Sequence, residues 1–404
     1  MKLKAISMAV AAVTAGFVLS ASAGVVKTEG EDIIVSTSNG GLQLKTESGD
    51  FSFKVSGKLQ WDYADYSDLM VDAAKTQDKG RSGYIRRGEV AFSGKAYDSW
   101  KYKLKLTSDE GNEKVKLDDA YIDYTGLNPV DVRVGRWDRS FGLEDSTSSS
   151  WIMAIERPMI FSALNGGGGN KYGIQLATEG DNYTLSLGLH NNGEVDEENT
   201  KQERLASYAV RATFAPVMED NMLVHVGINY YNANPDKKED RTISVAPAVK
   251  KAAKVDLVNL TSVKSDSEYV LELAGQFQSL QAQAEYAVRD LKSDDANADG
   301  KVSGYYGQLS YMLDGGKRSY KGGAFSKPES GQWELFGRYG KIKGEKDGVS
   351  EDTEITTYTL GVNYFATKNI RASLNYVNAK LDHKVDADKH DKGSAVVGRL
   401  QYVF

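Results

Sequence analysis

The amino-acid sequence predicts an all-β fold: a transmembrane antiparallel β-barrel of about sixteen strands, with an inward-folded third extracellular loop. Long segments alternate between apolar and polar side chains at every second residue, as a wall with one lipid-facing and one water-facing side requires. The connections between these segments alternate between short and long. The composition, with 23 Tyr, 40 Gly and only 6 Pro, suits strands better than helices. Together these observations predict a barrel.

Residues 1–23 have the composition of a cleaved export signal. Lys2 and Lys4 precede a short apolar run, and Ala21-Ser22-Ala23 supplies small residues for cleavage before Gly24. The run is rich in Ala and Ser, which argues against a membrane anchor. We therefore expect a mature chain of residues 24–404, cleaved after Ala23 and exported at least as far as the periplasm. The predicted transmembrane β-barrel then places it in the bacterial outer membrane.

The composition also excludes several classes of protein. No other stretch reaches ~18 consecutive apolar residues, so helical membrane spans are not expected. Cysteine is absent and the four histidines are scattered, so neither a metal site nor a catalytic centre is predicted, and no cofactor. The 50 basic and 56 acidic residues form no continuous basic stripe, which disfavours nucleic acid as a partner.

The clearest wall segment is 51–63. Phe51, Phe53, Val55, Leu59, Trp61 and Tyr63 share one face, and the residues between them are polar except for Gly57. This alternation is longer than the usual strand of ~5–6 residues. Residues 100–106 repeat it, with lysines on the wet face. The last segment, 395–404, places Val396, Leu400, Tyr402 and Phe404 on an apolar face opposite Arg399 and Gln401.

Reading the whole chain in this way gives a barrel domain over residues 51–404. The predicted strands are 51–66, 82–96, 99–108, 114–125, 130–140, 171–178, 182–191, 204–215, 222–233, 267–277, 279–289, 302–313, 331–345, 353–366, 369–381 and 394–404.

The connections support this assignment. Short links with turn residues fall at 97–99, 125–129, 179–181 and 366–368, and long links lie between them, as periplasmic turns and extracellular loops alternate in a barrel. The link 314–330 is too long for its periplasmic position, so either a strand assignment is wrong or this turn carries extra structure. Residues 24–50, with a turn at 39–41, are expected to form a small periplasmic β segment. It is either an appendage or plug lip of the barrel or an N-terminal extension with no function of its own.

Two motifs resemble known sites but do not complete them. The glycine run 166–169 is followed by Asn170 and Lys171 without the Lys-Ser/Thr pair of a phosphate-binding loop, so a loop tip is expected. Asp295, Asn297 and Asp299 resemble half of a calcium loop, but Tyr306 stands where the bidentate Glu belongs. An acidic, solvated loop is the better interpretation.

Basic residues of the wall are the main candidates for a site. A barrel of about sixteen strands is wide enough for an aqueous channel, where Lys and Arg select anions. The candidates are Lys58, Arg86, Arg87, Lys101, Lys103, Lys105, Arg133, Arg136 and Arg139. Adjacent Arg86 and Arg87 cannot both point inward on a regular strand, so a bulge or a partner is needed. Alternatively, these cations pair with Glu89, Asp118, Asp119 and Asp123 and stiffen the wall.

The third long loop, 141–170, is the predicted constriction. Ser146 to Ser150 supply hydroxyl groups, and Glu156-Arg157-Pro158 adds an arginine whose planar fork suits an anion. A flexible polar loop is the alternative.

Ordered motifs over nearly the whole mature chain resemble the phosphate-selective porin O and P family. They include Phe51-Ser52-Phe53-Lys54, Gly57-Lys58-Leu59-Gln60, Arg86-Arg87, Trp100-Lys101-Tyr102, Tyr124-Thr125-Gly126-Leu127-Asn128-Pro129-Val130, Gly135-Arg136, Phe141-Gly142-Leu143-Glu144, Thr147-Ser148-Ser149, Glu156-Arg157, Trp333-Glu334-Leu335-Phe336 and Leu400-Gln401-Tyr402-Val403-Phe404.

The resemblance implies a trimeric, sixteen-stranded outer-membrane channel for phosphate-like anions, surrounded by lipid and lipopolysaccharide. It implies that Arg86 and Arg87 are the family's tandem arginines, Ser148 and Ser149 its loop serines, and Arg157 the arginine that closes the loop. Asp118 matches a pore carboxylate of the family. Lys58 replaces an arginine, which keeps the charge and loses the planar fork.

Two departures from the family stand out. Asp145 occupies the place of a central lysine, and such a reversal near a bound anion costs on the order of 1–4 kcal/mol. The family's external arginine ladder is reduced to Arg241 and a cluster of lysines at the outer vestibule: Lys250, Lys251 and Lys254.

The sequence therefore leaves two functions open. One is a trimeric diffusion channel that prefers anions such as phosphate or polyphosphate. The other is a general porin with weak or cation-leaning selectivity, made so by Asp145 and the thinned ladder. An enzyme or adhesin would need a catalytic constellation or a large extracellular domain, and neither is predicted.

Overall fold

The computed structural model describes residues 24–28, 30–37, 40–71, 79–108, 114–164, 170–191, 206–234, 239–294, 298–329, 331–348, 352–382 and 391–404. The predicted export signal and the glycine run 166–169 lie outside these residues, as do Asn39, Asp295 and Asn297. None of the described helices is long and apolar enough to cross a membrane.

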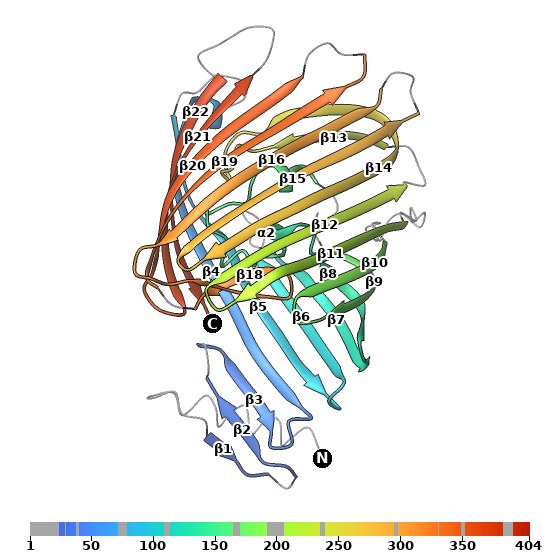
Figure 1. The fold of residues 1–404 in the computed structure, drawn as a ribbon, viewed down its shortest axis with the longest axis vertical. Helices are drawn as coiled ribbons and strands as arrows, with labels where there is room; N and C mark the ends of the chain where they lie inside the picture. The colour runs from blue at the N-terminus through green and yellow to red at the C-terminus, as the bar shows by residue number, and fades with distance from the viewer. Residues whose placement is uncertain are drawn as a thin grey trace.

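The predicted barrel is confirmed: sixteen antiparallel strands form a closed wall (Figure 1). The strands are β4 (Ser52–Ser67), β5 (Lys79–Ala96), β6 (Trp100–Ser108), β7 (Val115–Leu127), β8 (Val130–Asp138), β9 (Asn170–Glu179), β10 (Tyr183–Asn191), β11 (Ala206–Glu219), β12 (Met222–Asn234), β14 (Val255–Phe277), β15 (Leu280–Ser293), β16 (Gly300–Met312), β19 (Trp333–Lys346), β20 (Thr353–Phe365), β21 (Ile370–Asp382) and β22 (Lys392–Val403).

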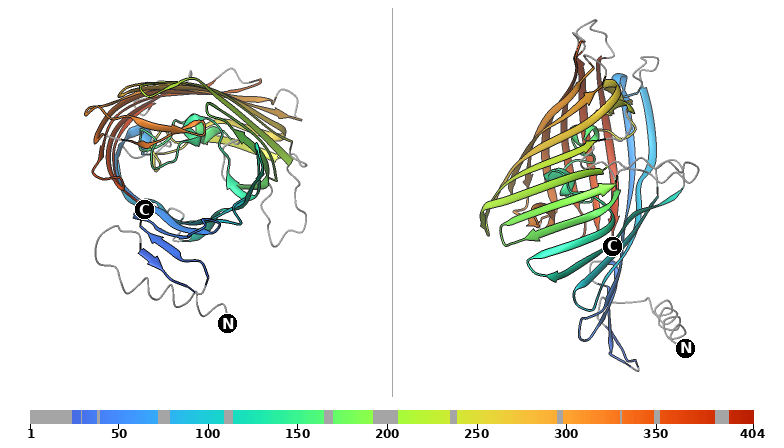
Figure 2. Two further views of the ribbon diagram at one scale, coloured as in Figure 1. Left: turned by 60° about the horizontal axis from the view of Figure 1, so that its bottom comes forward. Right: turned by 90° about the vertical axis from the view of Figure 1, so that its right-hand side faces the viewer.

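The wall closes between its first and last strands. Residues 395–403 of β22 pair in antiparallel register with residues 58–66 of β4, from Ala395 opposite Tyr66 to Val403 opposite Lys58. Closure satisfies the backbone groups of both edge strands, which lipid could not hydrogen-bond. Figure 2 shows the resulting ring from one end, with loop segments gathered inside it along one side.

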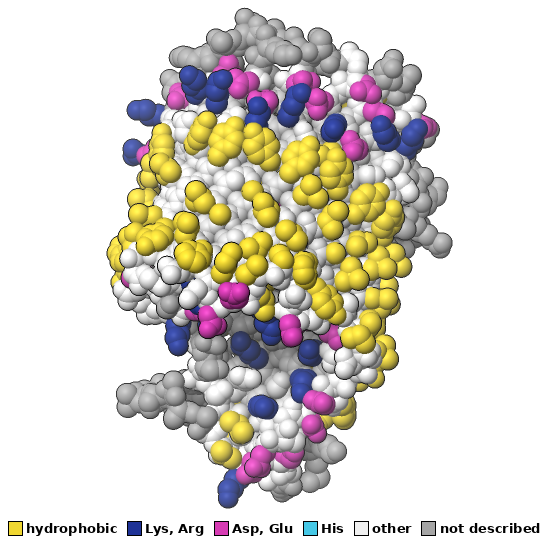
Figure 3. Space-filling view, viewed as in Figure 1, with side chains coloured by type: hydrophobic (Ala, Val, Ile, Leu, Met, Phe, Trp, Pro, Cys, Tyr) yellow, Lys and Arg dark blue, Asp and Glu magenta, His cyan; other side chains and the backbone are white. Residues whose placement is uncertain are grey.

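The side-chain alternation of each strand separates lipid from lumen. On β22, Leu400 is 54% exposed whereas its neighbour Gln401 is 1% exposed. On the face seen in Figure 3, apolar side chains form a band across the outside of the barrel, and charged side chains gather above and below it. Aromatic pairs such as Trp333–Tyr364 and Tyr339–Tyr358 lie on this wall, with ring centroids 4.5 and 5.2 Å apart. Amphipathic aromatic rings at the rims of an apolar band are typical of a membrane-spanning barrel.

The predicted β segment before the barrel consists of three strands. These are β1 (Gly24–Val26), β2 (Ile33–Ser36) and β3 (Leu42–Thr46), and β3 pairs with the start of β4. In Figure 1 they extend from the end of the barrel that also holds the C-terminus.

The long extracellular link 234–266 was wrongly expected to be only a loop. It contains β13 (Glu239–Val245), which pairs with the first part of β14, and β14 begins at Val255 rather than at 267. The hairpin folds across to the segment 68–70 that follows β4, where the Ala253 N–H donates to the Met70 carbonyl at 2.9 Å. Val249, Val255 and Leu257 are buried in this contact. Their apolar side chains explain why the segment covers the mouth instead of extending into water.

The over-long link 314–330 carries extra structure, and the strand assignments beside it are correct. It forms the hairpin β17 (Arg318–Lys321) and β18 (Ala324–Pro328). Phe325 belongs to the same buried cluster as Leu143 of α2 (Leu143–Ser146), a short helix inside the barrel. The turn therefore folds into the lumen and supports the third loop from below.

Candidate functional site

The third loop begins with a sharp bend that is anchored to the far wall. Gly142 has a φ of 98°, which favours glycine, and its N–H donates to Asn229 at 2.9 Å. The next two N–H groups, of Leu143 and Glu144, donate to the Glu285 carboxyl at 2.7 and 2.9 Å. The free N–H groups at the start of α2 thus receive acceptors from the strands.

Wall side chains hold the rest of the loop by its backbone. Arg371 donates to the carbonyls of Ser150 and Met153 at 3.0 and 2.8 Å, and Arg399 donates to the Ile155 carbonyl at 2.8 Å. Other donors, from the wall and from Arg318 of the hairpin β17–β18, continue this contact along the loop. They are Gln60 to Ser149, Gln401 to Ser150, Arg318 to Trp151, Asn363 to Met153, Arg338 to Glu156 and Arg289 to Ala163. Buried carbonyls that a soluble loop would expose to water are therefore satisfied by the barrel.

Glu156 is the loop's ionic anchor. Its carboxylate accepts two hydrogen bonds from Arg86, at 2.6 and 3.0 Å, and a third from Arg399 at 3.1 Å. Arg399 also forms a bidentate pair with Asp62 at 2.7 Å. Although burial opposes ionisation, Arg86 and its neighbouring arginines hold the pKa of Glu156 well below its usual range.

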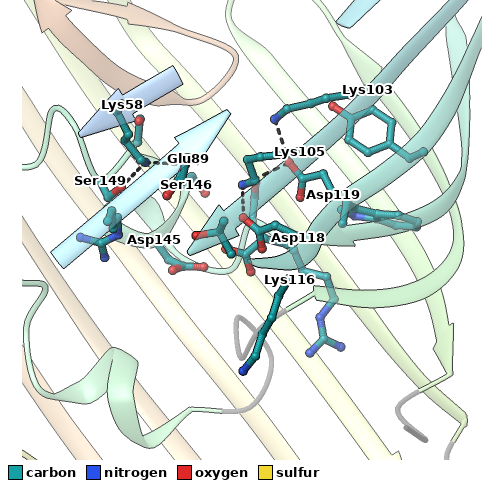
Figure 4. Close-up of a pocket in the computed structure, with 18 of the residues that line it drawn as sticks. Lys58, Glu89, Lys103, Lys105, Lys116, Asp118, Asp119, Asp145, Ser146 and Ser149 are labelled. Atoms are coloured by element: carbon teal, nitrogen blue, oxygen red, sulfur yellow. Dashed lines mark hydrogen bonds and ion pairs between the residues drawn. The ribbon is translucent and has the colours of Figure 1, made fainter. Parts of the chain in front are cut away.

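A cavity of about 430 Å³ lies between this loop and strands β4 to β8. Ten basic and five acidic side chains line it, so positive charge dominates. The basic residues are Lys58, Arg86, Arg87, Lys103, Lys105, Lys116, Arg133, Arg139, Arg157 and Lys250, and the acidic ones are Glu89, Asp118, Asp119, Asp138 and Asp145. We refer to this space as the constriction cavity. Figure 4 shows part of its lining.

A β-bulge allows Arg86 and Arg87 to reach the same cavity. Gln60 lies opposite Arg87 and Trp61 lies opposite Ile85, so Arg86 is the extra residue on β5. The two guanidinium groups then have different partners. Arg86 is bound to Glu156, whereas Arg87 donates one hydrogen bond, to the Gln60 amide oxygen at 3.0 Å. In the described part of the chain Arg87 has no carboxylate partner, which leaves most of its five N–H donors for a solute.

Lys58 connects the wall to the loop serines. Its ammonium group lies 2.7 Å from the Ser149 hydroxyl and 3.1 Å from a Glu89 oxygen. Ser148 and Ser146 also line the cavity, although the Ser146 hydroxyl donates to the Gly142 carbonyl at 2.6 Å. The predicted serines therefore lie together with Lys58, where hydroxyl and ammonium donors can replace part of an anion's hydration shell.

Further along the wall, cations and carboxylates pair as the alternative interpretation of the sequence expected. Lys105 lies 2.7 Å from Asp118 and 3.2 Å from Asp119, and Lys103 lies 2.8 Å from Asp119. Arg133 forms a bidentate pair with Asp123. This part of the lining is close to electrically balanced.

The position of Arg157 differs from what a solute-binding arginine needs. Its guanidinium donates to the carbonyls of Glu144, Asp145 and Thr147, at 3.0 to 3.2 Å. These bonds brace the loop and use much of the planar fork. Arg157 still lines the cavity and contributes its charge.

Asp145 has little compensation for its charge. The nearest cationic group is Arg157, at 3.5 Å, and the Asp145 Oδ2 atom is buried without a hydrogen-bond donor in the described structure. Burial raises the pKa of Asp145, and Arg157 offsets this only in part. Asp138 lines the same cavity and forms no ion pair within the described residues. Two poorly compensated carboxyl groups therefore lie in an otherwise cationic space.

The predicted vestibule cations are placed differently from one another. Arg241 is not free to meet a solute, because its guanidinium lies 2.8 Å from Asp266. Lys250 reaches down to the constriction cavity, and the Lys251 ammonium lies 5.5 Å from the ring centre of Tyr84. Lys254 is exposed to solvent. The four residues do not form one ladder.

One wall candidate was wrong. Arg136 does not line the cavity: it stacks on Tyr172, an outward tyrosine that is 49% exposed, at 5.4 Å. Arg136 follows Arg133 by three positions, an odd offset, so the two cannot share one face of a regular strand. Lys101 is exposed and lies outside the lining, whereas Arg139 lines the cavity.

The sequence interpretation missed the residues that position the loop. Arg318, Arg338, Arg371 and Arg399 lie far from the loop in sequence and were not singled out. In the sequence, they can be recognised only as arginines at lumen-facing positions of a wall strand or turn. Among the described residues, no group of three or more side chains could hold a metal ion. Asp299, from the calcium-like motif, is bound to Lys292 at 2.8 Å.

Comparison with known proteins identifies the family. The model of the family described as "Phosphate-selective porin O and P" matches residues 53–404. The chain belongs to this family. A curated member, Porin O of Pseudomonas aeruginosa, is 35% identical over 95% of each chain. As in the rest of the family, the molecule is a channel of the bacterial outer membrane, as the sequence predicted.

Solved structures share the fold of this family member at low sequence identity. An anion-selective porin from Comamonas acidovorans has a TM-score of 0.58 at 13% identity, covering 88% of this chain and 100% of its own. Salmonella typhi OmpF has a TM-score of 0.57 at 11% identity, covering 88% and 98%. A trimer form of OmpT from Vibrio cholerae has a TM-score of 0.53 at 12% identity, covering 88% and 99%. These likenesses confirm the closed sixteen-stranded barrel.

Proposed function

We propose that this channel passes small oxyanions, phosphate foremost, through the constriction cavity. The observation that carries the proposal is Arg87, a lumen guanidinium with one amide partner and no carboxylate partner in the described structure. Lys58, Ser148 and Ser149 line the same space and add ammonium and hydroxyl donors. The family description and the likeness to Porin O support phosphate as the solute.

The net charge of the side chains that line the cavity also favours selectivity for anions. Ten basic groups against five acidic ones leave an excess of positive charge where the passage is bounded by low-dielectric walls. Such a passage concentrates anions because the surrounding protein focuses the field. Charge pairs such as Lys105–Asp118 reduce this effect locally but do not cancel it.

A general porin with weak or cation-leaning selectivity is the second candidate. Asp138 and Asp145 favour it, because both line the passage: Asp138 has no ion pair in the described structure, and Asp145 has only a 3.5 Å contact with Arg157. The two candidates predict opposite behaviour in a salt gradient.

The experiment is a planar-bilayer measurement with the purified protein. Under a potassium chloride gradient, we expect a reversal potential on the anion side and a chloride current that phosphate blocks saturably. A reversal potential at zero or on the cation side, without phosphate block, contradicts the proposal and supports the second candidate.

We further propose that the protein is a homotrimer that lies in outer-membrane lipid and lipopolysaccharide and has no enzymatic activity. The trimer form of the related fold from Vibrio cholerae supports the oligomeric state. Analytical ultracentrifugation in detergent tests it, since a single monomer mass would contradict the assignment.

A further inference from the structure

Arg87 and the Asp138–Asp145 pair place incompletely satisfied groups of opposite charge in one cavity. Arg87 offers guanidinium donors, and Asp145 has only a 3.5 Å contact with Arg157. Asp138, on β8, is exposed to the lumen without an ion pair in the described residues. In the view of Figure 4, Asp145 lies between the Lys58–Ser149 pair and the Lys105–Asp118 pair.

Inorganic phosphate can pair with the cationic donors of this cavity but not with its two carboxylates. Its oxygens can accept from Arg87, Lys58 and the loop serines, but it carries no donor cation for the carboxylates and is repelled by them. A cavity of about 430 Å³ also holds more than a single phosphate group. A larger solute with a second, cationic group fits both the charge and the space.

We propose that the preferred solutes include zwitterionic organophosphorus compounds, phosphonates or phosphate monoesters that carry a protonated primary amine. The phosphoryl group binds at Arg87 and Lys58, and the ammonium group lies toward Asp145 and Asp138. This assignment rests on the proposed anion pathway and names the class of solute that the same cavity takes.

A matched pair of solutes tests the idea. 2-Aminoethylphosphonate and ethylphosphonate share the phosphonate group and differ in the ammonium group. A purely cationic constriction binds the amine-bearing compound more weakly, because its net negative charge is smaller. A constriction with both free cationic donors and carboxylates binds the amine-bearing compound more tightly. We expect a difference of about fivefold, because the ammonium group gains one partly exposed ion pair.

The measurement is block of chloride current by each phosphonate and by inorganic phosphate in planar bilayers at neutral pH. We expect tighter block by 2-aminoethylphosphonate in the natural protein and loss of that preference in Asp145→Asn. Asp138→Asn, outside the loop, is the second variant, in case the first alters the loop. Asp131→Asn is the matched control, because Asp131 is exposed on the same strand and does not line the cavity.

The outcomes separate this inference from the proposed function. Equal block by the two phosphonates, or weaker block by the amine, overturns the zwitterion assignment while leaving phosphate passage intact. A preference that persists in both Asn variants also overturns it, because the carboxylates are then not its source. If neither phosphonate nor phosphate blocks, the anion pathway itself fails.

Discussion

Arg86 and Glu156 form a bidentate ion pair that joins the barrel wall to the third loop. The Nε–Oε1 and Nη2–Oε2 distances are 2.6 and 3.0 Å, and both side chains are largely shielded, with exposures of 12% and 15%. Seventy residues separate the two partners along the chain. The pair fixes one edge of the constriction cavity, while Arg87, the next residue, remains available to solutes.

Glu156→Gln should loosen the loop. The change removes the bidentate carboxylate that Arg86 binds in a shielded site and costs about 3–5 kcal/mol of local stability, because a largely buried ion pair loses one of its two members. We expect a lower unfolding temperature of the barrel, read from heat-dependent mobility on gels, and a noisier open-channel current. Glu179→Gln, at an exposed strand end, is the control. Unchanged temperature and noise would show that the loop does not depend on this pair.

Arg87→Gln should weaken phosphate binding. Charge-assisted hydrogen bonds contribute about 1.5–3 kcal/mol, so the half-blocking phosphate concentration should rise about tenfold or more. The reversal potential should also move toward the cation side. Arg136→Gln removes the same charge outside the lumen and should change neither value, since Arg136 stacks on outward Tyr172. Equal effects of the two variants would remove Arg87 from the pathway.

Asp145→Lys should strengthen phosphate binding. It replaces a carboxyl group of the lining with an ammonium group, and a change of about 1–4 kcal/mol is expected near a bound anion. Phosphate block of chloride current measures the effect. An affinity that stays the same in Asp145→Lys would mean that phosphate passes at a distance from this side chain.

Anion preference should fall as the pH rises. Burial raises the pKa of Asp145, so its carboxyl group is neutral below that raised pKa and gains negative charge as the pH passes through it. The added charge repels anions and shifts the reversal potential toward the cation side. Measurements in a chloride gradient at stepped pH avoid the titration of phosphate itself. Asp145→Asn should flatten the profile; an identical profile in this variant would assign the dependence to another group.

Much of the fold could be predicted from the sequence because the alternation of apolar and polar residues along a barrel strand shows which face lies toward lipid. Alternation over 51–63 or 395–404 shows which side chains face lipid, and all sixteen wall strands follow from it. The hairpin of β13 with the first part of β14 was missed because it lies within a link, beyond the wall. Extra structure in the link 314–330 was one of two alternatives, but its form, the hairpin β17–β18, was not predicted. Their positions are decided by contacts such as Phe325 with the buried cluster of Leu143, which no local pattern reveals.

The candidate site was predictable only in part for a related reason. Lys58, Arg87 and Ser149 belong to recognisable motifs, and the structure brings them to one cavity. Other candidate cations are neutralised by carboxylates that lie elsewhere in the sequence: Arg86 pairs with Glu156, and Arg241 pairs with Asp266. A sequence shows which charges exist, but the folded barrel decides which of them remain available.

The wall arginines hold the third loop through its carbonyl oxygens, which every amino acid possesses. Arg371 and Arg399 would make the same contacts whatever side chains the loop presented to the passage. Over much of the third loop, the position of the backbone therefore does not depend on which side chains the loop carries. Substitutions at the solute-facing positions of such a loop can therefore change which solutes the channel admits, while the barrel sequence that holds the loop stays the same.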